Sequence, residues 1–125
     1  MKRILVVNDT EVLLDMFKLL LEDAGYEVML TDFPTQQVRD IERINPDLII
    51  LDFMFGHENL GWQMLQMLKM HTSTRNIPVI VSSAALNVVR QQQEYLKSQG
   101  VAVIYKPFDI DELLGTIKQL LLKHR

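Results

Sequence analysis

Side chains that could bind a phosphoryl group or a metal ion follow four apolar segments of this 125-residue chain. In chain order they are Asn8 and Asp9, then Asp52, then Ser82 and Ser83, and finally Lys106. An aspartate carboxylate can attack phosphorus to form an aspartyl-phosphate, and Asp52 is the candidate nucleophile. Two nearby carboxylates repel each other unless a cation lies between them, and Mg²⁺ prefers oxygen ligands. The set predicts a phosphate and metal site wherever the fold brings these residues together.

Five short apolar segments rich in Val and Ile predict the strands that must position these side chains. They are residues 4–7, 26–30, 48–51, 77–81 and 101–105. The first, third and fourth are continuously apolar, as strands buried on both faces of a parallel sheet are. The second includes Glu27 and suits an edge strand.

Helical periodicity separates the strands. Leu13, Phe17 and Leu20 are spaced i, i+4, i+7 and predict a first helix that ends at Gly25. A second predicted helix begins at Pro34, carries Val38, Ile41 and Ile44, and stops at Asn45-Pro46. A third covers about residues 60–71.

Two further helices are predicted in the last third of the chain. One runs from the N-cap Asn87 to Gln99, ahead of Gly100, and the other is opened by a capping box of Asp109 and Glu112.

This alternation predicts an α/β fold, a doubly wound five-stranded parallel sheet of (βα)5 organisation, in one domain over residues 1–125. In such sheets ligands bind beyond the carboxyl ends of the strands. All the reactive side chains lie at such ends. We therefore expect them to meet at one edge of the sheet.

Composition excludes several function classes. With 13 Lys and Arg against 16 Asp and Glu and no block of like charge, the chain lacks the basic stripe that direct nucleic-acid binding needs. The absence of cysteine excludes disulfides, thiolate catalysis and Cys-based metal sites. The longest apolar runs are about half a membrane span, so we expect no membrane insertion and a cytoplasmic location.

Four segments, taken in order, resemble the receiver domains of response regulators in two-component signalling. They are Ile-Leu-Val-Val-Asn-Asp at 4–9, Pro-Asp-Leu-Ile-Ile-Leu-Asp at 46–52, Pro-Val-Ile-Val-Ser-Ser-Ala at 78–84 and Tyr-Lys-Pro-Phe at 105–108. Together they span the chain and are far more specific than any one alone. The resemblance implies the flavodoxin-like strand order 2-1-3-4-5.

The resemblance also implies roles for individual residues. Asp52 would accept a phosphoryl group from a sensor histidine kinase or a histidine phosphotransfer protein. Mg²⁺ would be bound by Asp9, Asp52 and the backbone carbonyl of Met54, with Asn8 contributing indirectly. Lys106 would contact the bound phosphoryl group.

Ser83 rather than Ser82 would be the switch hydroxyl, because it lies five residues after Pro78. The implied function is a signalling switch rather than an enzyme. Phosphorylation would change the conformation that a downstream protein recognises at the fourth helix, fifth strand and fifth helix. A homodimer is one assembly that the resemblance allows.

The chain departs from the family pattern in the metal site and the loop after Asp52. Asn8 stands where the family usually has a second acid, which predicts weaker metal binding. Gly56 takes the place of a proline, and Gly61 lies nine rather than eight residues after Asp52. One residue is inserted, so we expect a more flexible loop over residues 53–61.

Other departures concern switching and dephosphorylation. Val103 stands at the aromatic switch position, so a rotating aromatic ring is not expected. Met54 and Ala85 carry no acid or amide that could orient a water molecule, which predicts slow self-dephosphorylation. Trp62 is expected to pack beside the site.

Three alternative functions compete with a phosphorylated receiver. A degenerate receiver that binds partners without phosphorylation is favoured by Asn8 and the altered loop. A phosphatase of the haloacid-dehalogenase type normally carries a second Asp at the position of Met54, and that acid is missing here. A flavodoxin-like carrier is disfavoured because the acidic segment 8–11 would repel a flavin phosphate.

Overall fold

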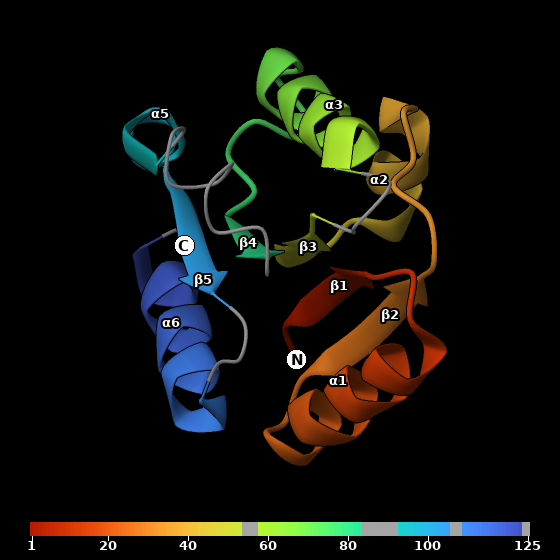
Figure 1. Cartoon of the computed structure of the whole chain (residues 1–125), viewed down its shortest axis with the longest axis vertical. Helices are drawn as coiled ribbons and strands as arrows, with labels where there is room; N and C mark the ends of the chain where they lie inside the picture. The colour runs from red at the N-terminus through yellow and green to blue at the C-terminus, as the bar shows by residue number, and fades with distance from the viewer. Residues whose placement is uncertain (54–57, 84–92, 106–108, 124–125) are drawn as a thin grey trace.

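Five parallel strands form one sheet at the centre of the molecule (Figure 1). The computed structural model describes residues 1–53, 58–83, 93–105 and 109–123. The strands are β1 (Arg3–Val7), β2 (Glu27–Thr31), β3 (Leu48–Asp52), β4 (Val79–Ser83) and β5 (Val101–Tyr105). Their order is β2-β1-β3-β4-β5, and every neighbouring pair is parallel. The predicted doubly wound sheet is confirmed, with β2 as an edge strand.

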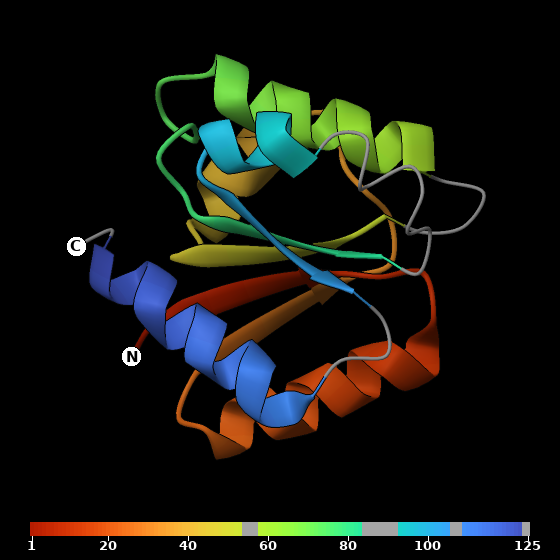
Figure 2. The same ribbon diagram turned by 60° about the vertical axis from the view of Figure 1, so that its left-hand side comes forward.

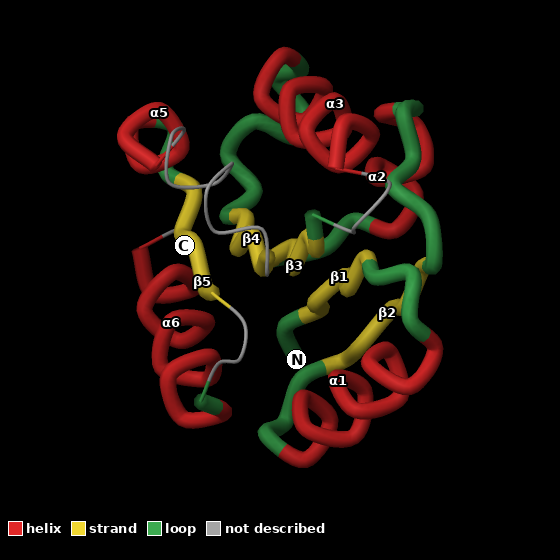
Figure 3. Tube along the Cα trace, in the orientation of Figure 1, coloured by secondary structure: helices red, strands yellow, loops and turns green. Residues whose placement is uncertain are grey.

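Helices cover both faces of the sheet (Figures 2 and 3). They are α1 (Glu11–Asp23), α2 (Val38–Ile44), α3 (Glu58–Met70), α5 (Gln93–Ser98) and α6 (Ile110–Lys123). The helices α1 and α6 lie against one face, whereas α2, α3 and α5 lie against the other. None of the helices in the described ranges is long and apolar enough to cross a membrane.

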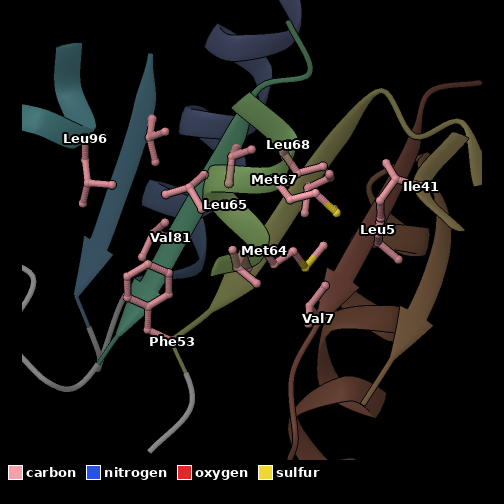
Figure 4. Close-up of a cluster of buried hydrophobic side chains, with 14 residues drawn as sticks. Leu5, Val7, Ile41, Phe53, Met64, Leu65, Met67, Leu68, Val81 and Leu96 are labelled. Atoms are coloured by element: carbon pink, nitrogen blue, oxygen red, sulfur yellow. The ribbon is translucent and has the colours of Figure 1, made fainter. Parts of the chain in front are cut away.

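Alternate residues of β1, β3, β4 and β5 enter two separate hydrophobic layers. In β3, Ile49 and Leu51 pack with Met64 and Leu68 of α3, a layer shown in Figure 4. The intervening residues of β3 join the layer under α1 and α6, which is built around Phe17. Side chains alternate along a strand, so the uninterrupted apolar run of β3 fills both layers.

The first predicted helix is confirmed, although its buried stripe is displaced. Leu14, Phe17 and Leu21 are buried, whereas the predicted Leu13 and Leu20 are half-buried. Gly25 follows the C-cap of α1 with φ 95°, a left-handed conformation that glycine adopts without strain.

The predicted start of the second helix is wrong. Helix α2 begins at Val38, and Pro34 lies in the loop before it. Hydrogen bonds hold this segment outside the helix, because Gln36 Nε2 donates both to the Pro34 carbonyl, at 3.1 Å, and to the Leu60 carbonyl, at 2.9 Å. The helix ends as expected at Asn45, which is left-handed with φ 52°.

Within the described residues, α5 and α6 lie where the sequence predicts helices. Helix α5 belongs to the predicted segment 87–99, whose N-cap Asn87 lies outside the described residues. Gly100 follows it with φ 74°. Asp109 caps α6, since its Oδ1 accepts a 3.1 Å hydrogen bond from the backbone N–H of Asp111.

A buried hydroxyl closes the end of α3 and yields a stability prediction. Thr74, 1% exposed, donates a 2.7 Å hydrogen bond from Oγ1 to the Leu68 carbonyl. Thr74→Val should lower the free energy of unfolding by about 1 kcal/mol, because the carbonyl loses its donor. Urea unfolding measures the change. Thr72→Val, at an exposed position of the same turn, is the control, and equal stability of the two variants would contradict the prediction.

Candidate functional site

A hydrogen bond between neighbouring strands forms the centre of the site. Strands β1 and β3 are paired through Val7 and Leu51, so the next residues, Asn8 and Asp52, meet at the carboxyl edge of the sheet. Asn8 Nδ2 donates a 2.9 Å hydrogen bond to Asp52 Oδ2. The two side chains are 1% and 3% exposed, respectively. The carboxylate therefore lies in the protein interior, with one oxygen held by an amide.

The orientation of the Asn8 amide follows from its partners. Its Oδ1 accepts a 2.9 Å hydrogen bond from the backbone N–H of Thr10. A carboxylate only accepts and a backbone N–H only donates, so the Asn8 nitrogen must face Asp52. The backbone N–H of Asn8 also donates to the Thr31 carbonyl, at 3.1 Å. Asn8 is thus anchored from β2, from the start of α1 and from Asp52.

The donor atoms at this edge suit a hard cation. Asp9 follows Asn8 and is exposed, with Oδ1 accepting a 3.3 Å hydrogen bond from Thr10 Oγ1. Across the described parts of the chain, no group of three or more His, Cys, Asp and Glu side chains could hold a metal ion. An ion here would need backbone and water oxygens in addition to Asp9 and Asp52. Mg²⁺ is commonly held by one or two carboxylates and several waters, so these residues fit it.

Strand β4 reaches the same edge from the other side of β3. Asp52 is paired with Ser82, and the backbone N–H of Phe53 donates to the Ser82 carbonyl at 2.9 Å. Ser83 is the last residue of β4 and is paired with Tyr105 of β5. The backbone thus brings the predicted residues Asn8, Asp52 and Ser83 to one edge of the sheet.

An aromatic contact lies next to Asp52, as predicted for Trp62. The buried ring of Phe53, the residue after Asp52, meets Trp62 edge-on, with 5.7 Å between ring centroids and an interplanar angle of 85°. Gly61 permits this approach, because a Cβ atom there would lie 3.2 Å from the Phe53 ring. Trp62 in turn contacts Tyr95 of α5, at 5.9 Å between centroids.

Two predicted site residues, Met54 and Lys106, lie outside the described residues, as does Gly56 of the altered loop. Met64 and Met67 are core residues, as their helical spacing suggests. Sequence reasoning missed the direct contact between Asn8 and Asp52. It named Ser82 but assigned the switch hydroxyl to Ser83, and the pairing of Ser82 with Asp52 depends on strand register.

Comparison with known proteins identifies relatives over nearly the whole chain. Residues 4–118 match the family described as the response regulator receiver domain. The chain is 30% identical over 121 residues to the polar-differentiation response regulator DivK of Brucella ovis, and the match covers 96% of each protein. It is 31% identical over 121 residues to the DNA-binding dual master transcriptional regulator RpaA of Synechocystis sp., covering 97% of this chain. The chain spans about half of RpaA, since the match covers 49% of that protein.

Solved structures share the fold. The signal receiver domain of a signal transduction histidine kinase from Syntrophus aciditrophicus is similar, with a TM-score of 0.80 and 30% identity over 98% of this chain and 92% of that one. The receiver domain of Francisella response regulator 1452 has a TM-score of 0.79 and 26% identity over 100% of both chains. The strand order, the family match and these relatives agree, and the chain belongs to the receiver domains of two-component response regulators.

Proposed function

We propose that this receiver domain is a phosphorylation switch whose phosphoacceptor is Asp52. One observation carries the proposal: a 3% exposed carboxylate ends a central strand, with Oδ2 held at 2.9 Å by the Asn8 amide. An aspartate that only capped a turn could do so at the surface, where water hydrates its carboxylate. Burying such a carboxylate would add nothing to the capping. Burial and a fixed orientation are useful for a nucleophile that must meet a phosphorus atom in line.

The proposed donor is a sensor histidine kinase or a histidine phosphotransfer protein. A bond forms between a carboxylate oxygen of Asp52 and phosphorus, while the phosphorus–nitrogen bond of the donor phosphohistidine breaks. The departing imidazole keeps the electron pair and takes a proton from water.

The residues around Asp52 would stabilise the charge of the phosphoryl group. When bound, Mg²⁺ would supply positive charge that offsets the negative charge of the carboxylates and of the phosphoryl group. Asp9, Asp52 and the backbone carbonyl of Met54 would hold it, with Asn8 acting indirectly by fixing Asp52. Ser83 and Lys106 would contact the bound phosphoryl group.

The output would be a change of conformation rather than turnover of a substrate. Phosphorylation adds charge at the carboxyl edge and shifts the balance between two conformations. A downstream protein in the cytoplasm would distinguish them at α5, β5 and α6. Phe53, Trp62 and Tyr95 form a continuous set of ring contacts from the residue after Asp52 to α5.

Acetyl phosphate and Mg²⁺ should add one phosphoryl group to the domain, detected by intact mass. Asp52→Asn should abolish the adduct, because an amide is not a nucleophile toward phosphorus. Asp23→Asn, at an exposed position at the end of α1, should leave it unchanged. Absence of an adduct on the unmodified domain, with no Mg²⁺-dependent change in Trp62 fluorescence, would instead favour a phosphorylation-independent interaction module.

Asn8→Asp should strengthen Mg²⁺ binding and weaken the metal-free fold. It replaces a donor to Asp52 Oδ2 with a second buried carboxylate, so the free energy of unfolding should fall by about 2 kcal/mol without metal. Mg²⁺ should restore much of this loss. Thermal unfolding across a Mg²⁺ titration measures both effects, with the exposed Asn76→Asp as control. An unchanged Mg²⁺ response in Asn8→Asp would contradict the prediction.

The phosphorylated domain should lose its phosphoryl group slowly. Met54 and Ala85 offer no acid or amide to orient the attacking water, so the aspartyl-phosphate should persist for minutes or longer after acetyl phosphate is removed. Intact mass followed over time measures the half-life. A half-life of seconds in the isolated domain would show that another group orients the water.

A further inference from the structure

Ser82 carries a buried hydroxyl with no evident structural purpose. The residue is 2% exposed, and within the described part of the chain its Oγ has no hydrogen-bond partner. Most buried polar side chains are hydrogen-bonded, because leaving one without a partner costs stability. An alanine would fill the same position without that cost. The hydroxyl therefore points to a function that the unphosphorylated fold does not display.

The register of the sheet places this hydroxyl beside the phosphoacceptor. Asp52 and Ser82 are directly paired on the adjacent parallel strands β3 and β4. Paired residues project toward the same face, and neighbouring strands lie about 4.8 Å apart. Ser82 is therefore the nearest position of β4 to the Asp52 carboxylate on that face.

Polar groups approach Asp52 from both neighbouring strands. Asn8, which directly follows β1, donates to Oδ2, and Ser82 of β4 lies on the opposite side of β3. The surrounding positions on this face are apolar: Ile50 and Ile80 form the next pair toward the core, and Ile104 is paired with Ser82 on β5. Low polarity strengthens any hydrogen bond made there.

We propose that the Ser82 hydroxyl donates a hydrogen bond to a phosphoryl oxygen once Asp52 is phosphorylated. This assignment rests on the proposed function and adds a phosphoryl contact distinct from Ser83. A phosphoryl group extends beyond the carboxylate and brings negatively charged acceptor oxygens close to β4. A hydroxyl that donates to a charged oxygen forms a strong hydrogen bond. The modification then supplies the partner that the Ser82 hydroxyl lacks among the described residues.

The test measures binding of beryllofluoride, a tetrahedral mimic of the phosphoryl group, at saturating Mg²⁺. Trp62 fluorescence or thermal stabilisation reports binding. Ser82→Ala should raise the apparent Kd about tenfold, the loss expected for one charge-assisted hydrogen bond. Its unfolding temperature without ligand should be equal to or above that of the unmodified domain, because the unpartnered hydroxyl is gone. Ser82→Thr keeps the hydroxyl and should bind within about threefold of the unmodified domain.

The controls separate the possible failures. Ser73→Ala removes an exposed hydroxyl distant in sequence from Asp52 and should bind like the unmodified domain. A Ser82→Ala variant with an unchanged Kd overturns the Ser82 assignment and leaves Asp52 as phosphoacceptor. Weaker binding by both Ser82→Ala and Ser82→Thr also overturns it, since the effect would then come from packing. Failure of the unmodified domain to bind beryllofluoride or to be phosphorylated overturns the proposed function itself.

Discussion

The parallel pairing of β3 with β1 and β4 is the constraint on which the site depends. It brings Asn8 and Ser82 to the two sides of Asp52, although these residues are distant in sequence. Side chains alternate along a strand, so a shift of one residue in one of these pairings would turn Asp52 away from the neighbour on that strand. The backbone hydrogen bonds of the sheet therefore determine the geometry around the carboxylate.

The two hydrophobic layers stabilise that pairing. All five residues of β3 are buried, and its alternate side chains pack under α3 on one face and around Phe17 on the other. Displacing β3 would expose the apolar side chains on both of its faces to water at once. Asn8, Asp52 and Ser82 are among the few buried polar residues of the described chain, and all three lie at the carboxyl edge. Burying a polar group lowers the stability of the fold, and these three groups are buried at the place where the proposed chemistry uses them.

The chain keeps the fold of the family but differs from its usual residues beside Asp52 and at the aromatic position of β5. Asn8 in place of an acid removes a charge that would repel Asp52 and supplies a donor to it instead. The aromatic contact that links the end of β3 to α5 passes through Trp62, whereas the usual aromatic position on β5 is Val103, which packs against the core layer of α3. Gly61 makes the close packing of α3 on Phe53 feasible.

The sequence by itself determined the fold class and the set of residues at the edge of the sheet. Apolar strand segments, helical periodicity and polar residues at strand ends are local patterns, and the resemblance supplied the strand order. Only the tertiary structure decided which atoms meet. The Asn8–Asp52 hydrogen bond joins residues 44 positions apart, and the pairing of Ser82 with Asp52 depends on strand register to a single residue. The loop before α2 is likewise tied to a distant segment, since Gln36 Nε2 donates to the Leu60 carbonyl. Contacts between distant segments set these features, and a local pattern carries no information about such contacts.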